Sequence, residues 1–484
     1  MSSNSHKVML IYPPGLWVQR GEDRCQINIE ETCIQTARAC NDLGYAASVL
    51  LNKNYDVFLR DYQTENASLD DVISDIKSYE PDMIMVSITN TTIFNDLNFV
   101  KEIKKYTDAK IVLKGAIFYN PPDEMLELVD LKDVDVVIGG EIDIIIDKVA
   151  DSLLRKQGEL SEVDCILYKN AEGTFEKTRF GCFEENLDDI PFPARHLMKN
   201  ELYVRPDTDE PLATIQTARG CPSACIYCLT PDISGKKVRS RSPQNVMEEI
   251  RECYEKYGIK NFFFKADTFT IDAKWVKELC ELIINSELNK KIEFIANSRV
   301  KPLTKETLVY MKKAGCFGIS FGFESGSDDT LKRIKKGAKV QDNLQASKWA
   351  KEAGIPVIGM FVIGFPWETK EHIEETKKHI FKLNPDFIEI SLALPFYGTE
   401  LYDMCKEQNL LDKSVLGSDF FYASMAHTPY FTTQELLKIR KNILSKFYTR
   451  PSYIAKKVLT SIKSPKVILN YFRYGFKLLR TLFK

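Results

Sequence analysis

The sequence lacks several features that mark common classes of protein. Its 484 residues contain no apolar run of about 18 residues, the length that a transmembrane helix requires. The 66 basic and 68 acidic residues nearly cancel, so the chain has no overall attraction to nucleic acid, and no nucleic-acid-binding module is visible. Its polar start leads directly into an apolar segment without the pattern of a signal peptide, which predicts a cytoplasmic protein.

Histidine is scarce, and most of the cysteines follow no pattern. The chain has five histidines, of which His6 is the only one in the first 150 residues. Nine of the 12 cysteines show no paired spacing, which favours a reducing compartment over a disulfide framework. The length alone predicts two or three domains.

The three other cysteines are the most informative feature of the chain. Cys221, Cys225 and Cys228 stand at C-x3-C-x2-C spacing, close enough for their thiolates to bind one soft metal centre. A structural zinc site needs a fourth ligand, but the next cysteine, Cys253, lies in a helical pattern. Three ligands on a [4Fe-4S] cluster instead leave one iron open for a substrate or cofactor.

The first part of the chain alternates between apolar strands and amphipathic helices. We expect strands at 8–12, 46–51, 83–88, 111–113 and 134–138, and helices at 29–43, 69–79, 94–106, 122–129 and 142–154. This alternation predicts a doubly wound α/β domain over residues 1–155. Ligands of such domains bind at the C-terminal strand ends, where small or polar residues suit a bulky cofactor with a phosphate. The candidates there are Ser87, Thr89, Gly115, Gly140 and Glu141.

A second alternating region follows a connector at residues 156–212, which contains a short hairpin around 170–173. Strands are expected at 213–217, 261–265, 292–296, 316–322, 357–364 and 387–391, with helices at 246–257, 273–284, 305–314, 342–353 and 372–383. Six strands with intervening helices predict a partial (β/α)6 barrel over residues 213–420. Among the residues at its strand ends, Asp267 and Glu324 are the candidate catalytic residues. The candidates for cofactor binding are Arg299, Glu324, Ser325, Gly359 and Gly364.

The cysteine triplet, with Tyr227 before its last cysteine, resembles the signature of radical S-adenosylmethionine (SAM) enzymes. The resemblance implies that the open iron binds SAM and that Tyr227 presents its backbone to the adenine. The segment Gly322-Phe-Glu-Ser-Gly326 resembles a motif whose Glu324 and Ser325 reach the ribose or amino group of SAM. The glycines at 359 and 364 resemble a motif that packs on the adenine. Asp267 stands where related enzymes keep a polar active-site residue, although Ala266 departs from their usual Asp-Asp-Thr.

Read with the triplet, the first domain resembles the cobalamin-binding domain of one large radical SAM family. The matching pieces are the opening strand with Pro13-Pro14, the Val-Ser-Ile-Thr strand end and the Gly-Gly-Glu near the end of the domain. The Asp-x-His-x-x-Gly loop of other cobalamin proteins is absent, so we expect cobalamin without a histidine on its lower face. The alternative is a scaffold that no longer binds cobalamin.

The resemblance covers residues 7–455 and includes cobalamin-dependent methylases and the anaerobic magnesium-protoporphyrin ester cyclase. It implies a methyltransferase that adds carbon to an unactivated position of a small-molecule or lipid-like substrate, with electrons from a donor such as flavodoxin or ferredoxin. One alternative is a radical SAM oxidoreductase or cyclase that transfers no methyl group. A second, from another class, is a non-catalytic zinc-binding protein.

Two further segments each allow two interpretations. Cys25, Cys33 and Cys40 would form a second cluster or, given their near-helical spacing, lie buried in a helix. Residues 421–484 predict basic amphipathic helices broken at Pro451 and Pro465. These helices would contact a membrane surface or pack on the barrel with a solvated basic face.

Overall fold

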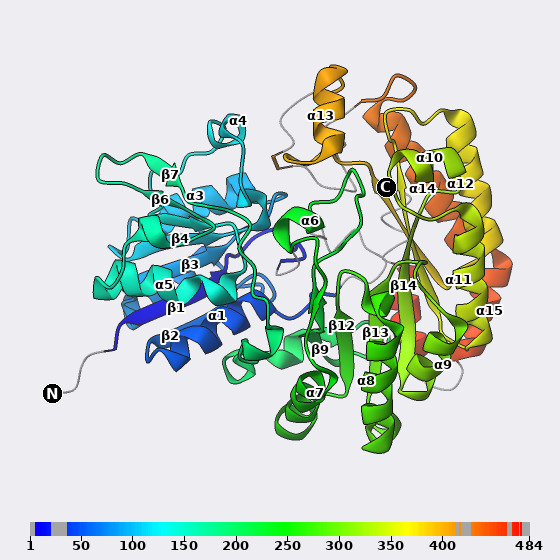
Figure 1. The fold of residues 1–484 in the computed structure, drawn as a ribbon, viewed down its shortest axis with the longest axis horizontal. Helices are drawn as coiled ribbons and strands as arrows, with labels where there is room; N and C mark the ends of the chain where they lie inside the picture. The colour runs from blue at the N-terminus through cyan, green and yellow to red at the C-terminus, as the bar shows by residue number, and fades with distance from the viewer. Residues whose placement is uncertain are drawn as a thin grey trace.

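The computed structural model describes residues 5–20, 36–411, 416–417, 427–461, 467–473 and 475–476. Two α/β units lie side by side, and each is built on its own seven-stranded sheet. In Figure 1 the N-terminal unit is blue to cyan, and the second unit runs from green through yellow to red. The predicted class, a doubly wound domain followed by a partial barrel and C-terminal helices, is confirmed.

The N-terminal sheet has the strand order β2-β1-β3-β4-β5-β6-β7. Strands β1 to β5 are parallel, and the hairpin β6–β7, predicted within the connector, extends the same sheet antiparallel to β5. The strands are β1 (Lys7–Tyr12), β2 (Asp56–Asp61), β3 (Met83–Ser87), β4 (Lys110–Lys114), β5 (Val136–Ile138), β6 (Ile166–Lys169) and β7 (Phe175–Lys177). The helices are α1 (Asn41–Asn52), α2 (Leu69–Tyr79), α3 (Ile93–Ile103), α4 (Asp123–Leu126) and α5 (Ile146–Ala150).

The prediction was wrong at the second strand. Residues 46–51 belong to helix α1, and the strand follows at β2. Short apolar runs suit a buried strand and a buried helix equally, and here Leu43, Ala46 and Leu50 recur at helical spacing and are fully buried. A helix was expected at residues 29–43. Residues 36–40 of that range are not helical, and residues 29–35 lie outside the described residues. Gly44 does not end a helix but lies inside α1, where an added Cβ would lie 2.8 Å from Pro193 Cβ.

The second sheet has the order β16-β15-β14-β13-β12-β9-β8, and the six strands from β9 to β16 are parallel, as predicted. Only β8 runs antiparallel, at the edge next to β9. The strands are β8 (Val204–Arg205), β9 (Glu210–Gln216), β12 (Asn261–Lys265), β13 (Glu293–Ser298), β14 (Cys316–Glu324), β15 (Val357–Ile363) and β16 (Phe387–Leu392). The helices between them are α7 (Pro243–Tyr257), α8 (Ala273–Asn285), α9 (Lys305–Lys313), α10 (Asp328–Arg333), α11 (Val340–Glu352) and α12 (Lys370–Leu383).

Within the described residues, the barrel is followed by α13 (Glu400–Glu407), α14 (Thr433–Tyr448), α15 (Pro451–Ser461) and a further helical segment between 467 and 476. Helix α14 packs against β16, and its Leu436, Ile443 and Phe447 enter the core of the barrel. The Nε of Arg440, a buried basic residue, donates to the Ile390 carbonyl at 2.7 Å. The first part of the basic tail therefore packs on the barrel, the second of the two predicted alternatives. Across the described residues, no helix is both long and apolar enough to cross a membrane.

Candidate active site

The cysteine loop begins where β9 leaves the barrel. Strand β10 (Ala218–Arg219) pairs with β11 (Arg239–Ser240), and the loop between β10 and α6 (Thr230–Ile233) carries the three cysteines. Gly220 has φ +91°, and an added Cβ would lie 2.0 Å from the Lys237 carbonyl oxygen, so only glycine fits. The Cys221 amide donates to the Gly235 carbonyl at 3.0 Å, which fixes the first cysteine against the following turn.

The chemistry of the three thiols fits the predicted cluster. All three are free cysteines; Cys221 and Cys225 are buried and Cys228 is partly exposed. Among the described residues no three Cys, His, Asp or Glu side chains are gathered as metal ligands, so the sulfur atoms do not stand in ligand geometry. The donor set itself, three thiols on one anchored loop, is the one that leaves a [4Fe-4S] cluster with an open iron.

Arg299, at the end of β13, reaches this loop. Its Nη1 lies 3.4 Å from Cys225 Sγ, and its Nη2 donates to the Lys336 carbonyl. Burial lowers the pKa of Arg299, but Cys225, Cys221 and Tyr227 together outweigh burial and the net shift is upward. A permanent positive charge therefore stands beside a thiol that must ionise to bind iron.

Glu324 is held by a lysine that the sequence did not single out. Glu324 ends β14 with φ 61°, a left-handed conformation that is rare outside glycine, and its Oε1 lies 2.6 Å from Lys336 Nζ. Both side chains are at most 10% exposed, so this is a buried ion pair. Burial of the Tyr227 phenol and then the Glu324 carboxylate raise the pKa of Tyr227 well above its usual value. In the sequence, Lys336 is one of several neighbouring basic residues, and nothing there distinguishes it as the partner of Glu324.

Three other residues expected to bind SAM make structural contacts. The Ser325 hydroxyl is fully buried, lies 3.0 Å from the Thr376 hydroxyl and accepts from the Ser327 amide. A Cβ on Gly359 would lie 3.1 Å from the Phe323 ring, and one on Gly364 would lie 2.7 Å from Leu436 of α14. Packing and hydrogen bonding within the protein are enough to explain why a serine and two glycines stand at these positions. Binding of SAM by these residues stays a prediction.

Glu368 supports the end of β15. Its Oε2 accepts from the amides of Gly364 at 2.7 Å and Phe365 at 3.1 Å, and the side chain is fully buried. Burial raises the pKa of Glu368 from 4.5 to about 7, although the two amides oppose the shift. The folded protein therefore favours the protonated form of Glu368. Protonated Glu368 contributes to the free energy of unfolding below pH 4.5, and this contribution is lost as pH rises through 7.

We therefore expect the variant Glu368→Gln, which stays neutral and keeps an acceptor for both amides, to gain stability relative to the parent protein as pH rises from 5 to 8. The difference between a pKa of 4.5 and one of about 7 corresponds to roughly 3 kcal/mol in free energy of unfolding. Denaturant unfolding at several pH values measures this gain, and Glu371→Gln, at an exposed position, is the control. Parallel pH curves for the parent and Glu368→Gln would contradict the shift.

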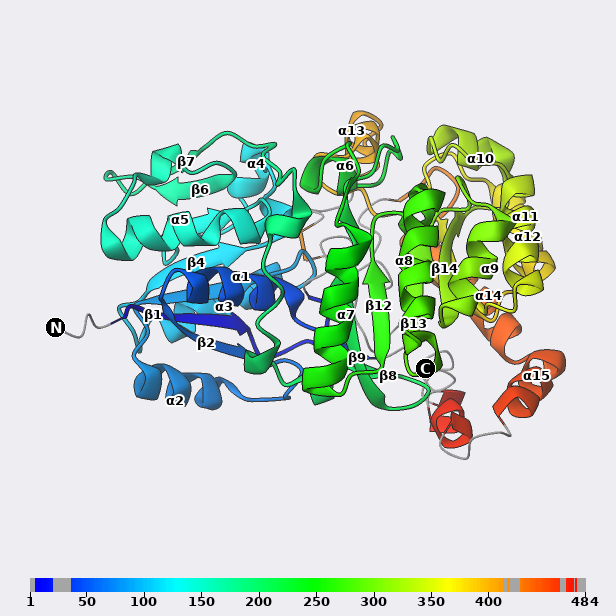
Figure 2. The ribbon, with the colours of Figure 1, turned by 60° about the horizontal axis from the view of Figure 1, so that its bottom comes forward.

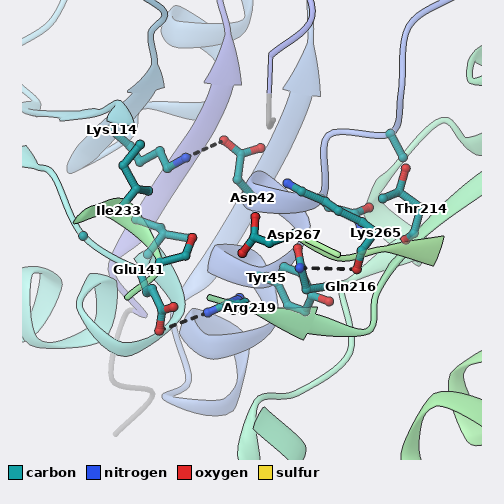
Figure 3. Close-up of a pocket in the computed structure, with 15 residues that line it drawn as sticks. Asp42, Tyr45, Lys114, Glu141, Thr214, Gln216, Arg219, Ile233, Lys265 and Asp267 are labelled. Atoms are coloured by element: carbon teal, nitrogen blue, oxygen red, sulfur yellow. Dashed lines mark hydrogen bonds and ion pairs between the residues drawn. The ribbon is translucent and has the colours of Figure 1, made fainter. Parts of the chain in front are cut away.

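A pocket lies between the two units, at the C-terminal ends of both sets of strands (Figure 3). The N-terminal unit contributes Asp42 and Lys114, whose charged atoms lie 3.7 Å apart. The barrel contributes Lys265 and Asp267 from the end of β12. The Asp267 Oδ2 accepts from the Gly220 amide at 2.7 Å, so this predicted catalytic carboxylate also holds the start of the cysteine loop.

The lining of this pocket suits the polar groups of a ligand. Two buried atoms on residues that line it, Asn41 Oδ1 and Thr214 Oγ1, have no hydrogen-bond partner in the part of the chain that the structure describes. Such atoms are costly unless a ligand or water completes their hydrogen bonds. The amide groups around the rim of cobalamin are suitable partners. Among the described residues no histidine lines this pocket, and a lower face of cobalamin without histidine stays a prediction.

The predicted cobalamin residues are divided between this pocket and the protein interior. Ser87 donates to Asp42 Oδ2 at 2.8 Å, behind the pocket wall. The Thr89 hydroxyl lies 2.8 Å from that of Thr92, in a buried network. Cβ atoms on Gly115 and Gly140 would lie 2.9 Å from Ile88 Cγ1 and 2.6 Å from Cys165 Cβ, so both glycines are needed for packing, and Gly140 also lines the pocket. A role in cofactor binding stays a prediction for all of them.

Glu141 joins the two units. Its carboxylate lies 2.7 Å from Arg239 Nη2 and 3.3 Å from Arg219 Nη1. Arg219, which directly precedes Gly220 of the cysteine loop, also pairs with the buried Asp143. This ion-pair network fixes the cysteine loop against the C-terminal edge of the N-terminal sheet. The sequence singled out Glu141 but not its partners, because the paired residues lie at least 76 positions apart.

The alternative of a second cluster finds no support at Cys40. This thiol is fully buried, and the Tyr203 hydroxyl donates to its sulfur at 3.1 Å. Burial, followed by the charge of Asp61, raises the pKa of Cys40 well above its usual value, which opposes the thiolate that iron requires. Cys40 precedes α1 instead of lying in a helix, and Cys25 and Cys33 lie outside the described residues.

Comparison with known proteins identifies the family of this chain. Residues 215–380 match the radical SAM superfamily, and residues 42–149 match the B12 binding domain. An uncharacterized methyltransferase of Pyrococcus horikoshii is 30% identical over 419 residues, 86% of this chain and 89% of the relative. The hopanoid C-3 methylase of Methylococcus capsulatus is 25% identical over 74% of this chain and 67% of that protein.

Among solved structures, the radical SAM methyltransferase TsrM of Kitasatospora setae, with cobalamin and a [4Fe-4S] cluster bound, superposes with a TM-score of 0.67. It is 16% identical and covers 85% of this chain and 76% of its own, which shows a shared fold. The chain belongs to the radical SAM superfamily, and it is a radical SAM enzyme with a B12-binding domain. These matches confirm the predicted family and its cofactors, which are a [4Fe-4S] cluster, SAM and cobalamin. They do not support the alternative of a non-catalytic zinc-binding protein.

Proposed function

We propose that this enzyme transfers a methyl group to an unactivated carbon of a small-molecule or lipid-like substrate. The observation that carries the proposal is the pocket between the two units, which opens at the C-terminal strand ends of both the B12-binding domain and the barrel. When bound, the cluster supplies an electron for cleavage of SAM, and cobalamin supplies a carrier for the methyl group. An electron donor such as flavodoxin or ferredoxin, and contact of the tail with a membrane, belong to the same proposal.

The chain's own residues bind and orient these groups. Cys221, Cys225 and Cys228 would hold the cluster, with the Arg299 guanidinium beside Cys225. The buried pair of Glu324 and Lys336 offers one acceptor and one donor to the amino and carboxylate groups of SAM. Because both groups are largely excluded from water, each interacts more strongly there than it would at the surface.

The pocket wall would hold cobalamin and the substrate. Asp42 and Lys114 contribute charged groups from the N-terminal unit, while Lys265 and Asp267 contribute them from β12. The ion pairs of Glu141 and the neighbouring Asp143 keep the two walls at a fixed separation. Such a fixed separation favours transfer between two cofactors, because the reacting groups need not be brought together anew in each turnover.

Product analysis tests the proposal. The reconstituted enzyme, with a chemical reductant and SAM labelled in its methyl group, is incubated with an extract of cellular metabolites and lipids. We expect label in a new carbon-bound methyl group, with S-adenosylhomocysteine and 5′-deoxyadenosine formed together. Formation of 5′-deoxyadenosine without S-adenosylhomocysteine or transferred label would identify an oxidoreductase or cyclase and overturn the proposal.

A further inference from the structure

The C-terminal helices expose an apolar surface. It consists of Ile454, Val458 and Leu459 of α15 and Leu469, Phe472 and Phe476 of the following helical segment, which we call the tail surface. These side chains are 44 to 73% exposed, and Phe476 is the most exposed of the described large apolar residues. Large apolar side chains gathered in this way on a soluble protein mark a site of interaction.

The opposite faces of the same helices are bound to the barrel. The Tyr453 hydroxyl donates to the Asp386 carbonyl at 2.9 Å, and Lys457 lies 3.8 Å from the ring of Phe387 and 5.6 Å from that of Tyr471. Asn470 donates to Asp209 Oδ2 at 3.0 Å. Both helices are therefore held side by side, and their outward faces are not needed for this packing.

The second helical segment has a narrow apolar stripe. Leu469, Phe472 and Phe476 are separated by three and four residues, so they lie on one face of a helix. Asn470 and Tyr471, which contact the barrel, lie on the other face. A stripe of exposed aromatic and aliphatic side chains opposite a fixed polar face is the arrangement of a helix that lies in an interface between water and lipid.

Charge indicates which partner fits. Residues 436–484 contain 13 lysines and arginines and no acidic residue. Several of these cations are already paired, for example Lys456 with Asp386 and Arg473 with Asp209, but the excess of positive charge remains. An anionic lipid surface offers both an apolar layer and opposite charge. A second copy of the chain would bring two such basic segments together, because a twofold interface uses the same patch twice.

We propose that the tail surface docks on anionic membranes. It lies at the N-terminal ends of the barrel strands, since its helices contact the start of β16 and the turn before β9. Figure 2 shows this end below the barrel, while α6 and α13 lie at the opposite end, beside the cysteine loop. Docking would anchor the enzyme with its pocket directed away from the lipid surface. The inference deepens the tail contact of the proposed function by naming its surface and its partner, and it does not depend on methyl transfer.

Vesicle binding tests this inference. The full chain, reconstituted with its cluster, is centrifuged with vesicles of phosphatidylglycerol and phosphatidylcholine or of phosphatidylcholine alone. We expect binding to the anionic vesicles, release at high salt, and little binding to the neutral ones. The double variant Phe472→Ser/Phe476→Ser should reduce binding roughly tenfold, because it removes the two exposed aromatic side chains of the tail surface.

Phe94→Ser is the matched control, because Phe94 is 49% exposed but lies on the N-terminal unit. It should bind as the parent does. Equal binding of the double variant and the parent to anionic vesicles would overturn the proposal, as would equal binding to neutral vesicles. Light scattering on the same samples reveals self-association, and a dimer that the double variant abolishes, without binding to vesicles, would assign the surface to a second copy of the chain and also overturn it.

Discussion

Replacement of Cys225 by alanine should abolish cleavage of SAM, with a fall in 5′-deoxyadenosine formation of at least about a hundredfold. The variant leaves two thiols, too few to hold a [4Fe-4S] cluster with a single open iron. It also removes the sulfur next to Arg299, which lies 3.4 Å away in the parent protein. Iron and sulfide content, visible absorbance and 5′-deoxyadenosine after anaerobic reconstitution measure the effect.

Cys182→Ala is the control for that experiment. Cys182 is also a free and partly exposed cysteine, but it lies in the connector, where it donates to Asp164 at 3.2 Å. Its replacement should leave iron content and SAM cleavage unchanged. If Cys225→Ala retained a full cluster and cleaved SAM, the triplet would not be the metal site. If Cys182→Ala lost the cluster, a ligand would lie outside the triplet.

Glu249→Ala should be the most destabilising substitution outside the site. Glu249 is 1% exposed and accepts from Arg195 at 2.6 Å and also from Arg241, and both arginines are buried. Burial raises the pKa of Glu249, but the two guanidinium groups outweigh it and lower the pKa below 4.5. The carboxylate is thus ionised in the folded protein. Its removal leaves two buried cations without a counter-charge.

The expected loss in free energy of unfolding is about 4 kcal/mol, the usual cost of breaking a buried ion pair from one side. Because Arg195 lies in the connector and Glu249 in α7, the loss should affect the junction of the two units. Denaturant unfolding measures it. Glu252→Ala, on the same helix and 3.5 Å from an exposed lysine, should change stability by less than about 1 kcal/mol. Equal effects of the two variants would contradict the proposed role of the buried pair.

The confirmed strands share a simple physical origin. The six barrel strands and most of the N-terminal ones are apolar runs between turn residues, and such runs depend on local sequence alone. The second strand was misplaced because α1 is buried along most of its length, and burial removes the polar face that would have distinguished a helix from a strand. The tail likewise allowed two interpretations, and α14 packs on β16 because Leu436, Ile443 and Phe447 enter the barrel core.

The sequence by itself determined the cysteine triplet, the two α/β units and hence the family of the enzyme, because each depends on residues close together in the chain. Only the tertiary structure decided which charges meet. Lys336 pairs with Glu324, Arg219 with Asp143, and Glu249 with two arginines, and the partners come from different strands, helices and loops. The same holds for the tail surface, since local periodicity cannot tell which face of a helix the barrel leaves exposed. Pairing and exposure depend on how separate strands, helices and loops come together in three dimensions, and no local pattern encodes these contacts.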